Sequence, residues 1–209
     1  MKKLTNLCVT IQADTVLEFQ QKIKKAETTA DLIEIWLEKT TVDFADIRKM
    51  TKKPLLAKGN NARSLIDALH KGADLIDVPL KNSSALTKKL NEIRGRKKTT
   101  LIISYHNFKD TPSLPKLWAL FQKARASGAN IVKIATTAKT VDDNLTIFNL
   151  LLKTRQTTTP CIAVCMGEQG QISRLLGSVF GSYLSYVALD QESITAKGML
   201  TLEEWQSKR

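Results

Sequence analysis

A lysine lies inside an apolar stretch of the chain, where a charged side chain is rarely found. Lys133 is the central residue of Ile131–Ala135, and its four neighbours there are apolar. Burial disfavours the charged form, and a lysine whose pKa is lowered toward neutrality becomes a free amine, which attacks carbonyl carbon. The plainer interpretation is a wrongly placed strand, or a lysine at a strand end that pairs with a carboxylate. Other ionisable residues help to decide between the two.

Three of these residues are predicted to point toward the same interior as Lys133. Glu34, Asp77 and His106 each lie in or directly after a short apolar stretch that is typical of a β-strand. Successive side chains of a strand point to opposite faces, so the apolar neighbours face outward and these residues face inward, together with Trp36. Ionisable groups that converge near strand ends are typical of a catalytic site more than of core packing.

Only one of the two histidines is a candidate for catalysis. His106 ends a predicted strand, which is where barrel enzymes place acid–base groups. His70 is followed by Lys71 and Gly72 at a predicted helix C-terminus, where a cation interacts well with the helix dipole. We therefore assign His70 to the surface and His106 to the site.

The elements that must position these residues alternate between strands and amphipathic helices. Apolar residues recur at helical spacing in two examples, Val16-Phe19-Ile23-Ala26 and Leu86-Leu90-Ile93. Gly72 and Gly128 are predicted to end helices, and Pro54 and Pro160 to precede strands. The predicted strands are Leu7–Ile11, Leu32–Leu37, Pro54–Ala57, Leu75–Val78, Leu101–Tyr105, Ile131–Ala135, Cys161–Cys165 and Tyr183–Ala188.

Eight strands that alternate with helices predict an α/β protein with a compact (β/α)8 TIM barrel. The barrel would occupy residues 1–209 as a single catalytic domain, near the lower size limit of this fold. A doubly wound open sheet is the alternative. It is disfavoured because no Gly-rich phosphate-binding fingerprint follows the first strand.

The composition and the cysteine spacing indicate the cellular compartment and argue against a metal site built from cysteines. No stretch approaches the roughly 20 apolar residues that span a bilayer, and the N-terminus lacks the apolar region of a signal peptide. Three cysteines give an odd count without disulfide spacing, so we expect a reducing cytoplasm. Cys161 and Cys165 share one strand and have no second pair, which predicts core packing and no metal site.

The net charge of +12 raises the question of nucleic-acid binding. The basic residues are scattered over predicted helices and loops, without interleaved aromatic residues or a zinc-finger, basic-zipper or RNA-recognition signature. A solvated basic surface, helped by an anionic substrate, is the better interpretation, and we expect neither a nucleic-acid nor a membrane partner. Four of the clusters are Lys22-Lys24-Lys25, Lys52-Lys53, Lys88-Lys89 and Arg94–Lys98.

Four segments together resemble type I 3-dehydroquinate dehydratase, the Schiff-base-forming enzyme of the shikimate pathway. The similarity covers almost the whole chain, and Phe180-Gly181-Ser182 fits it as well. A chance match of all the segments in this order is improbable. The segments are Glu34–Leu37, Ile102–Phe108, Gly128–Ala135 and Met166–Arg174.

The resemblance implies a mechanism without a metal or a dissociable cofactor. Lys133 would form an imine with the C3 ketone of 3-dehydroquinate, and His106 would remove a C2 proton and then protonate the departing C1 hydroxyl. Arg174 would pair with the substrate carboxylate, for which its planar fork is suited. Glu34 would accept hydrogen bonds from ring hydroxyls, and Thr195 keeps a hydroxyl that the family has in its lid.

The chain departs from the family around this chemical core. Trp36 stands where the family has a substrate-contacting arginine. The loop after the third strand lacks the family's arginine, glutamate and Gly-Gly pair, so Lys58 is the candidate to replace the lost positive charge. The family's Ser-Ala-Pro-Gly-Gln lid reads Thr195-Ala196-Lys197-Gly198-Met199 here. The residues that the resemblance assigns to the chemistry, Lys133 and His106, are thus kept, while the residues around them that would bind the substrate are altered.

Three functions remain open from the sequence. The favoured one is an active dehydratase with a remodelled pocket, because an unused buried lysine would be costly to keep. The second is another imine-forming lyase or aldolase on the same barrel, with Trp36 selecting a less polar substrate. The third is a non-catalytic barrel that binds a partner, such as another shikimate-pathway enzyme; a homodimer is a further expectation.

Overall fold

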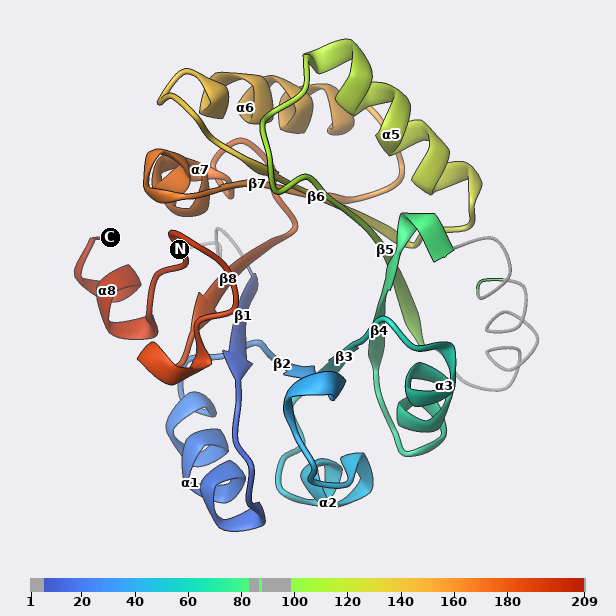
Figure 1. Cartoon of the computed structure of the whole chain (residues 1–209), viewed down its shortest axis with the longest axis vertical. Helices are drawn as coiled ribbons and strands as arrows, with labels where there is room; N and C mark the ends of the chain where they lie inside the picture. Colours follow the sequence, from blue (N-terminus) through green and yellow to red (C-terminus); the bar gives the residue numbers. More distant parts are fainter. Residues whose placement is uncertain (1–5, 83–86, 88–98, 209) are drawn as a thin grey trace.

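Eight parallel strands form a nearly closed barrel with the helices on its outside, which confirms the predicted (β/α)8 fold (Figure 1). The computed structural model describes residues 6–82, 87 and 99–208. The strands are β1 Asn6–Ile11, β2 Leu32–Trp36, β3 Leu55–Lys58, β4 Leu75–Pro79, β5 Thr100–His106, β6 Ile131–Thr137, β7 Cys161–Met166 and β8 Leu184–Ala188. The helices are α1 Val16–Ala26, α2 Phe44–Lys49, α3 Ala62–His70, α5 Leu114–Ala126, α6 Asp143–Thr154, α7 Gln171–Leu176 and α8 Leu202–Ser207.

The eight predicted strands are all present, with ends that differ by one or two residues. Leu37 is one such difference, because it begins the short 3₁₀ helix η1 (Leu37–Lys39) and does not end β2. The strand order is β7-β6-β5-β4-β3-β2-β1-β8, and each neighbouring pair is parallel. Across the remaining seam, the Tyr183 amide donates to the Cys161 carbonyl at 2.8 Å. All the carboxyl ends of the strands therefore open on one side of the barrel.

Two apolar layers confirm the predicted inward and outward faces. Residues such as Ile33, Ile76, Ile103 and Val132 point outward and pack in the main core beneath the helices. A second cluster fills the inside of the barrel in the N-terminal halves of the strands. Because this plug closes one end, polar side chains gather at the carboxyl end. The plug consists of Cys8, Leu32, Leu56, Ile102, Ile131, Ile162 and Leu184.

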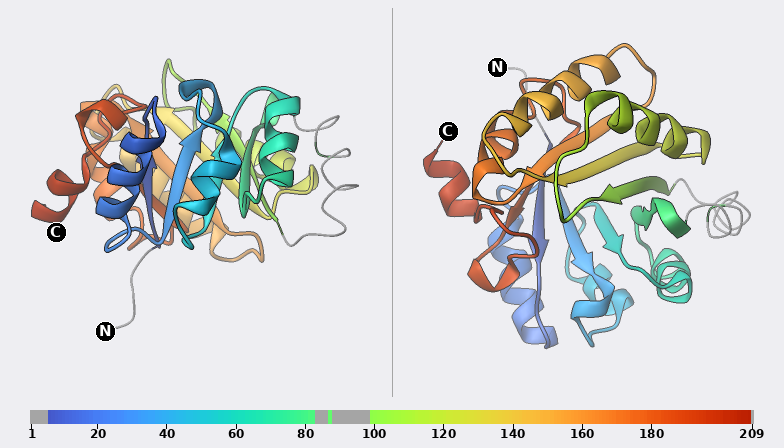
Figure 2. Two further views of the ribbon diagram at one scale, coloured as in Figure 1. Left: turned by 90° about the horizontal axis from the view of Figure 1, so that it is seen from below. Right: turned by 45° about the horizontal axis from the view of Figure 1, so that its top comes forward.

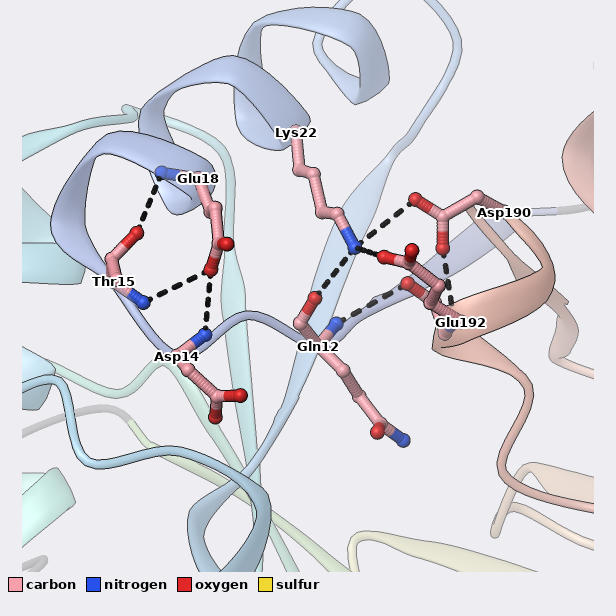
Figure 3. Close-up of polar contacts among 8 residues, drawn as sticks. Gln12, Asp14, Thr15, Glu18, Lys22, Asp190 and Glu192 are labelled. Atoms are coloured by element: carbon pink, nitrogen blue, oxygen red, sulfur yellow. Dashed lines mark hydrogen bonds and ion pairs between the residues drawn. The ribbon is translucent and has the colours of Figure 1, made fainter.

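Helix ends follow local sequence signals. The Thr15 hydroxyl accepts from the Glu18 amide at 3.2 Å, and the Glu18 carboxylate accepts from the Thr15 amide at 3.1 Å (Figure 3). This reciprocal capping box satisfies two amides that a helix start leaves without partners. Gly72 and Gly128 follow α3 and α5 with φ angles of 99° and 89°, as predicted for helix ends.

Lys22 of α1 fixes the start of the loop that follows β8. Its Nζ donates to the Gln12 carbonyl and to Glu192, each at 2.9 Å, and lies 3.2 Å from Asp190 (Figure 3). Burial works to lower the pKa of Lys22, but its bonds to Glu192 and Asp190 outweigh burial and raise the pKa. Lys22 therefore connects α1, the end of β1 and the short η4 helix (Gln191–Ser193).

The same loop then packs backbone to backbone on the turn after β7. The Gly167 amide donates to the Lys197 carbonyl at 2.8 Å. Gly198 has a φ angle of 71°, and a Cβ added there would lie 2.2 Å from the Gly167 oxygen. This contact requires glycine at position 198, because any side chain would force the two loops apart.

Two predictions and the search for membrane spans depend on which residues are described. The helix predicted on Leu86, Leu90 and Ile93 and the basic clusters at 88–89 and 94–98 lie outside the described residues. Within the described ranges, no helix has both the length and the apolar character needed to cross a membrane.

The second view of Figure 2 shows α5 and α6 lying over the strands β5 to β7.

We expect Gly198→Ala to lower the free energy of unfolding by about 1–3 kcal/mol, because a methyl group at positive φ meets a backbone oxygen. Urea denaturation measures the change. Gly59→Ala is the matched control, because the nearest atoms to its new Cβ would all belong to side chains, those of Glu38, Leu37 and Ser64, at 3.2, 3.3 and 3.5 Å. The control should change the free energy by less than about 1 kcal/mol. Equal losses in the two variants would contradict this account of the loop contact.

Candidate active site

Residues from five neighbouring strands meet at the carboxyl end of the barrel. Lys133, Asp77 and Glu34 are each the third residue of their strands, β6, β4 and β2. Lys58 and His106 are the last residues of β3 and β5. The strand register pairs Lys58 with Asp77, so two opposite charges lie side by side on adjacent strands. The predicted convergence of Glu34, Asp77, His106 and Lys133 is therefore observed.

Lys133 is buried among groups that favour its charged form. Its Nζ donates to Asp77 Oδ2 at 3.1 Å, lies 3.6 Å from Glu34 Oε1 and sits 3.9 Å from the ring centre of Tyr186. Burial works to lower the pKa of Lys133, but Tyr186, Asp77 and Glu34 outweigh it and raise the pKa well above its usual value. Burial alone would lower the pKa, and the sequence could not reveal how close these partners lie.

Asp77 accepts from two lysines through one oxygen. Its Oδ2 lies 3.1 Å from Lys133 Nζ and 3.0 Å from Lys58 Nζ, and the side chain is only 1% exposed. Burial would raise the pKa of Asp77, but Lys58, Lys133 and His106 together hold it well below its usual range. Asp77 is therefore a carboxylate at every pH at which the protein is expected to work.

Glu34 is held by hydrogen bonds on one oxygen and faces Lys133 with the other. Its Oε2 accepts from the Thr10 hydroxyl at 2.7 Å and from the Trp36 indole at 2.9 Å. Its Oε1 is the atom 3.6 Å from Lys133 Nζ. Trp36 thus points inward as predicted, and it orients Glu34 in addition to lining the site.

His106 is a neutral imidazole beside a lysine. Its Nε2 lies 3.4 Å from Lys58 Nζ, and its ring is stacked with that of Phe108 at 6.0 Å between centres. Burial lowers the pKa of His106 to about 3, with help from the positive charges of Lys58 and Lys133 and against the effect of Asp77. A neutral imidazole can accept a proton, which is what a general base must do.

Arg174 brings a buried guanidinium to the same place. It lies on α7, is 7% exposed, and donates from Nη2 to the Lys197 carbonyl at 3.5 Å. Its Nε has no hydrogen-bond partner within the described part of the chain. Burial lowers the pKa of Arg174 to about 10, which leaves it charged. A buried cation with an unused donor is suited to an anionic ligand such as a carboxylate.

One cavity contacts all seven residues that the sequence predicted for the site, and its volume is about 70 Å³. A second hollow of about 450 Å³ adjoins it on the side of β3 to β5, and Trp36, Lys58, His106 and Phe108 line both. Together they offer space in the range of ligand pockets, roughly 300–1,000 Å³. The predicted residues at the first cavity are Glu34, Trp36, Lys58, His106, Lys133, Arg174 and Thr195.

Sequence reasoning missed Tyr186, whose ring lies beneath Lys133. The alternation rule applied to β8 would have placed its side chain in the interior together with Leu184 and Ala188. Thr195, which was predicted, bonds from its hydroxyl to Met199 sulfur at 3.4 Å and lines the cavity from the loop after β8. No group of His, Cys, Asp and Glu that could hold a metal ion occurs among the residues described.

Proteins similar to this chain in sequence include several that are named 3-dehydroquinate dehydratase. Residues 57–207 match the family described as Type I 3-dehydroquinase. The chain is 33% identical, over 98% of its length, to the chloroplastic bifunctional 3-dehydroquinate dehydratase/shikimate dehydrogenase of Arabidopsis thaliana, but it spans only 36% of that protein. It is 29% identical to the 3-dehydroquinate dehydratase of Coxiella burnetii, in a match that covers 99% of this chain and 93% of that protein.

Solved structures agree on the fold. The crystal structure of type I 3-dehydroquinate dehydratase from Clostridium difficile superposes with a TM-score of 0.86 at 23% sequence identity, over 97% of this chain and 90% of that one. The resemblance inferred from four sequence segments is therefore confirmed at the level of the family. Because the family match extends over most of the barrel, the chain belongs to the type I 3-dehydroquinase family.

Proposed function

We propose that this protein is a 3-dehydroquinate dehydratase, which converts 3-dehydroquinate to 3-dehydroshikimate and water through an imine on Lys133. The observation that carries the proposal is a buried lysine amine and a neutral histidine at the edge of one cavity in a barrel of this family. The reaction is a carbon–oxygen lyase reaction, and it needs an electron sink next to the carbon that loses a proton.

Substrate binding would use the polar groups around the cavity. The substrate carboxylate would pair with Arg174, whose Nε is free to donate. Glu34 would accept hydrogen bonds from ring hydroxyls once its contact with Lys133 loosens, and Thr195 offers a hydroxyl from the loop after β8. Lys58 supplies positive charge on the opposite wall, where the cavity meets the second hollow.

The first chemical step would be imine formation. Lys133 must lose a proton before its nitrogen attacks the C3 carbonyl carbon, because an ammonium has no free electron pair. The resulting carbinolamine then loses its hydroxyl as water, which requires one proton, and leaves a protonated imine. The positive charge of this imine takes the place of the ammonium between Asp77 and Glu34.

Elimination would follow on the imine. His106 removes a proton from C2, and the electron pair of that bond moves toward the imine nitrogen to give an enamine. The enamine returns the electrons as the C1 hydroxyl leaves, and His106 donates the proton that makes the leaving group water. Hydrolysis of the imine then releases 3-dehydroshikimate and restores Lys133.

A second candidate is another imine-forming lyase or aldolase on the same barrel. The observation in its favour is the indole of Trp36, which lines both hollows and sits 5.1 Å from Lys58 Nζ. An apolar surface of this kind suits a less polar ketone. Screening ketones with borohydride trapping would separate the two candidates, since only the dehydratase releases 3-dehydroshikimate.

The name of one relative supports a proposal about the partners of the barrel. Since the Arabidopsis relative carries the names of both 3-dehydroquinate dehydratase and shikimate dehydrogenase, association with a separate shikimate dehydrogenase is one proposal. A homodimer is another, and a cytoplasmic location with no nucleic-acid partner remains a prediction. Sedimentation of the protein alone and with such a dehydrogenase would distinguish the two assemblies.

We expect borohydride to trap an adduct on Lys133 when the protein is incubated with 3-dehydroquinate, and mass spectrometry to locate it. Lys133→Ala should give no adduct and should lower kcat by at least about 10³-fold, because the nucleophile is lost. The exposed Lys123→Ala, on the outside of the barrel, is the matched control and should behave like the unaltered protein. A folded, unaltered protein that forms no adduct would overturn the proposed function.

We expect kcat/KM to stay nearly constant between roughly pH 5 and 8, without the decline near pH 6.5 that an ordinary histidine base produces. The sign follows from the pKa of about 3, since a lowered pKa keeps His106 neutral, and therefore basic, at lower pH. His106→Gln should lower kcat by about 10²–10⁴-fold. An inflection near pH 6.5 that disappears in His106→Gln would contradict the predicted protonation state.

A further inference from the structure

Lys58 connects the two residues of the proposed chemistry through Asp77. Lys133 Nζ lies 3.1 Å from Asp77 Oδ2, the same oxygen lies 3.0 Å from Lys58 Nζ, and Lys58 Nζ lies 3.4 Å from His106 Nε2. The first two distances are those of hydrogen bonds between nitrogen and oxygen, and the third is a close polar contact between two nitrogens. A continuous path therefore runs from the Lys133 amine to the His106 imidazole.

This path is shielded from water. The side chains of Asp77, Lys133 and Lys58 are 1%, 8% and 13% exposed. Lys58 and Asp77 are register partners on β3 and β4, so the backbone holds their contact in place. The nearest acceptors for a proton that leaves Lys133 are the carboxylates of Asp77 and Glu34, at 3.1 and 3.6 Å from Nζ.

Imine formation requires a proton to be removed at one end of the path and a proton to be supplied at the other. The Lys133 ammonium must give up a proton before it can attack a ketone, and the carbinolamine hydroxyl must gain one before it can leave as water. The carboxylates of Asp77 and Glu34 stabilise the protonated form of Lys133, so the removal of this proton is the difficult step. His106 begins as a neutral imidazole and so has a free nitrogen to accept the proton, and its pKa of about 3 means that the imidazolium gives the proton up readily.

We propose that Asp77 and Lys58 pass one proton from Lys133 to His106 as the substrate is attacked. The Lys58 ammonium first gives a proton to His106 Nε2 and becomes a neutral amine. Lys133 Nζ gives a proton to Asp77 Oδ2, and Asp77 gives a proton to the Lys58 amine. Asp77 and Lys58 end in the protonation states in which they began, Lys133 is a neutral amine, and His106 is an imidazolium. The imidazolium then protonates the carbinolamine hydroxyl. This inference rests on the proposed function, and it makes Lys58 a positioning and proton-carrying residue.

A lysine suits this role where an arginine would not. An ammonium can lose and regain a proton, whereas a guanidinium stays protonated in proteins. Burial lowers the pKa of Lys58, as does Lys133, although Asp77 and Glu34 act in the opposite direction. The charged groups that face His106 are Lys58 of β3, Asp77 of β4 and Lys133 of β6.

The simpler role for Lys58 is that of a fixed positive charge for the substrate, and two variants separate the roles. Lys58→Arg keeps the charge and removes a transferable proton, while Lys58→Met removes both. Rapid mixing with 3-dehydroquinate, quenching with borohydride and mass spectrometry give the rate of imine formation. Circular dichroism checks that each variant is folded, and Lys123→Arg is the control for an exposed lysine.

We expect Lys58→Arg to slow imine formation by at least about tenfold while KM changes by less than about threefold. The unaltered protein should show a solvent deuterium isotope effect on this step with a curved dependence on the D₂O fraction, and Lys58→Arg should lose the curvature. Lys58→Cys alkylated with 2-bromoethylamine restores a titratable amine at nearly the same position, and it should recover the rate.

Three results would overturn the inference, and they can be told apart. If Lys58→Arg forms the imine at the rate of the unaltered protein, Lys58 acts by charge alone and the path is wrong, although the proposed function stands. If the unaltered protein forms no imine, the proposed function fails and the path fails with it. If the alkylated cysteine variant is folded but stays as slow as Lys58→Arg, a titratable amine is not what the step requires and the path is wrong.

Discussion

The buried carboxylate of Asp77 is the group on which the interior of the barrel depends. Without it, Lys133 and Lys58 would be two cations removed from water on neighbouring strands, and one uncompensated buried charge costs about 3–5 kcal/mol. That is a large part of the roughly 5–15 kcal/mol that keeps a domain folded. Asp77 therefore allows two amines to lie in the cavity, and in return it keeps Lys133 protonated until a substrate arrives.

The barrel makes this arrangement through its register and its apolar layers. Parallel strands present their carboxyl ends together, while the apolar plug closes the other end and directs polar side chains to one opening. The loop after β8, fixed by Lys22 and packed through Gly198 on Gly167, lines the cavity at that opening. Arg174 reaches the cavity beside this loop with an unused Nε. The proposed carboxylate-binding residue Arg174 thus comes from α7, while the proposed catalytic Lys133 and His106 come from strands.

Side-chain alternation was enough to predict which strand residues face inward, because the period of a strand is a local property. The pKa of Lys133 could not be predicted in this way. Its main carboxylate partner, Asp77, is 56 residues away in sequence, and only the packed structure brings the two to 3.1 Å. The contact of Gly198 with Gly167 and the ring of Tyr186 beneath Lys133 depend on tertiary structure for the same reason.

The chemistry of the cavity depends on Lys133 being an ammonium at rest, held by Asp77 and Glu34. Nitrogen NMR of the protein labelled with ¹⁵N at the lysine Nζ, with Lys133→Ala to assign the signal, tests it most directly. The account predicts that the Lys133 signal keeps the chemical shift of an ammonium from neutral pH up through the usual lysine pKa. A Lys133 signal with the shift of a neutral amine at neutral pH would contradict it.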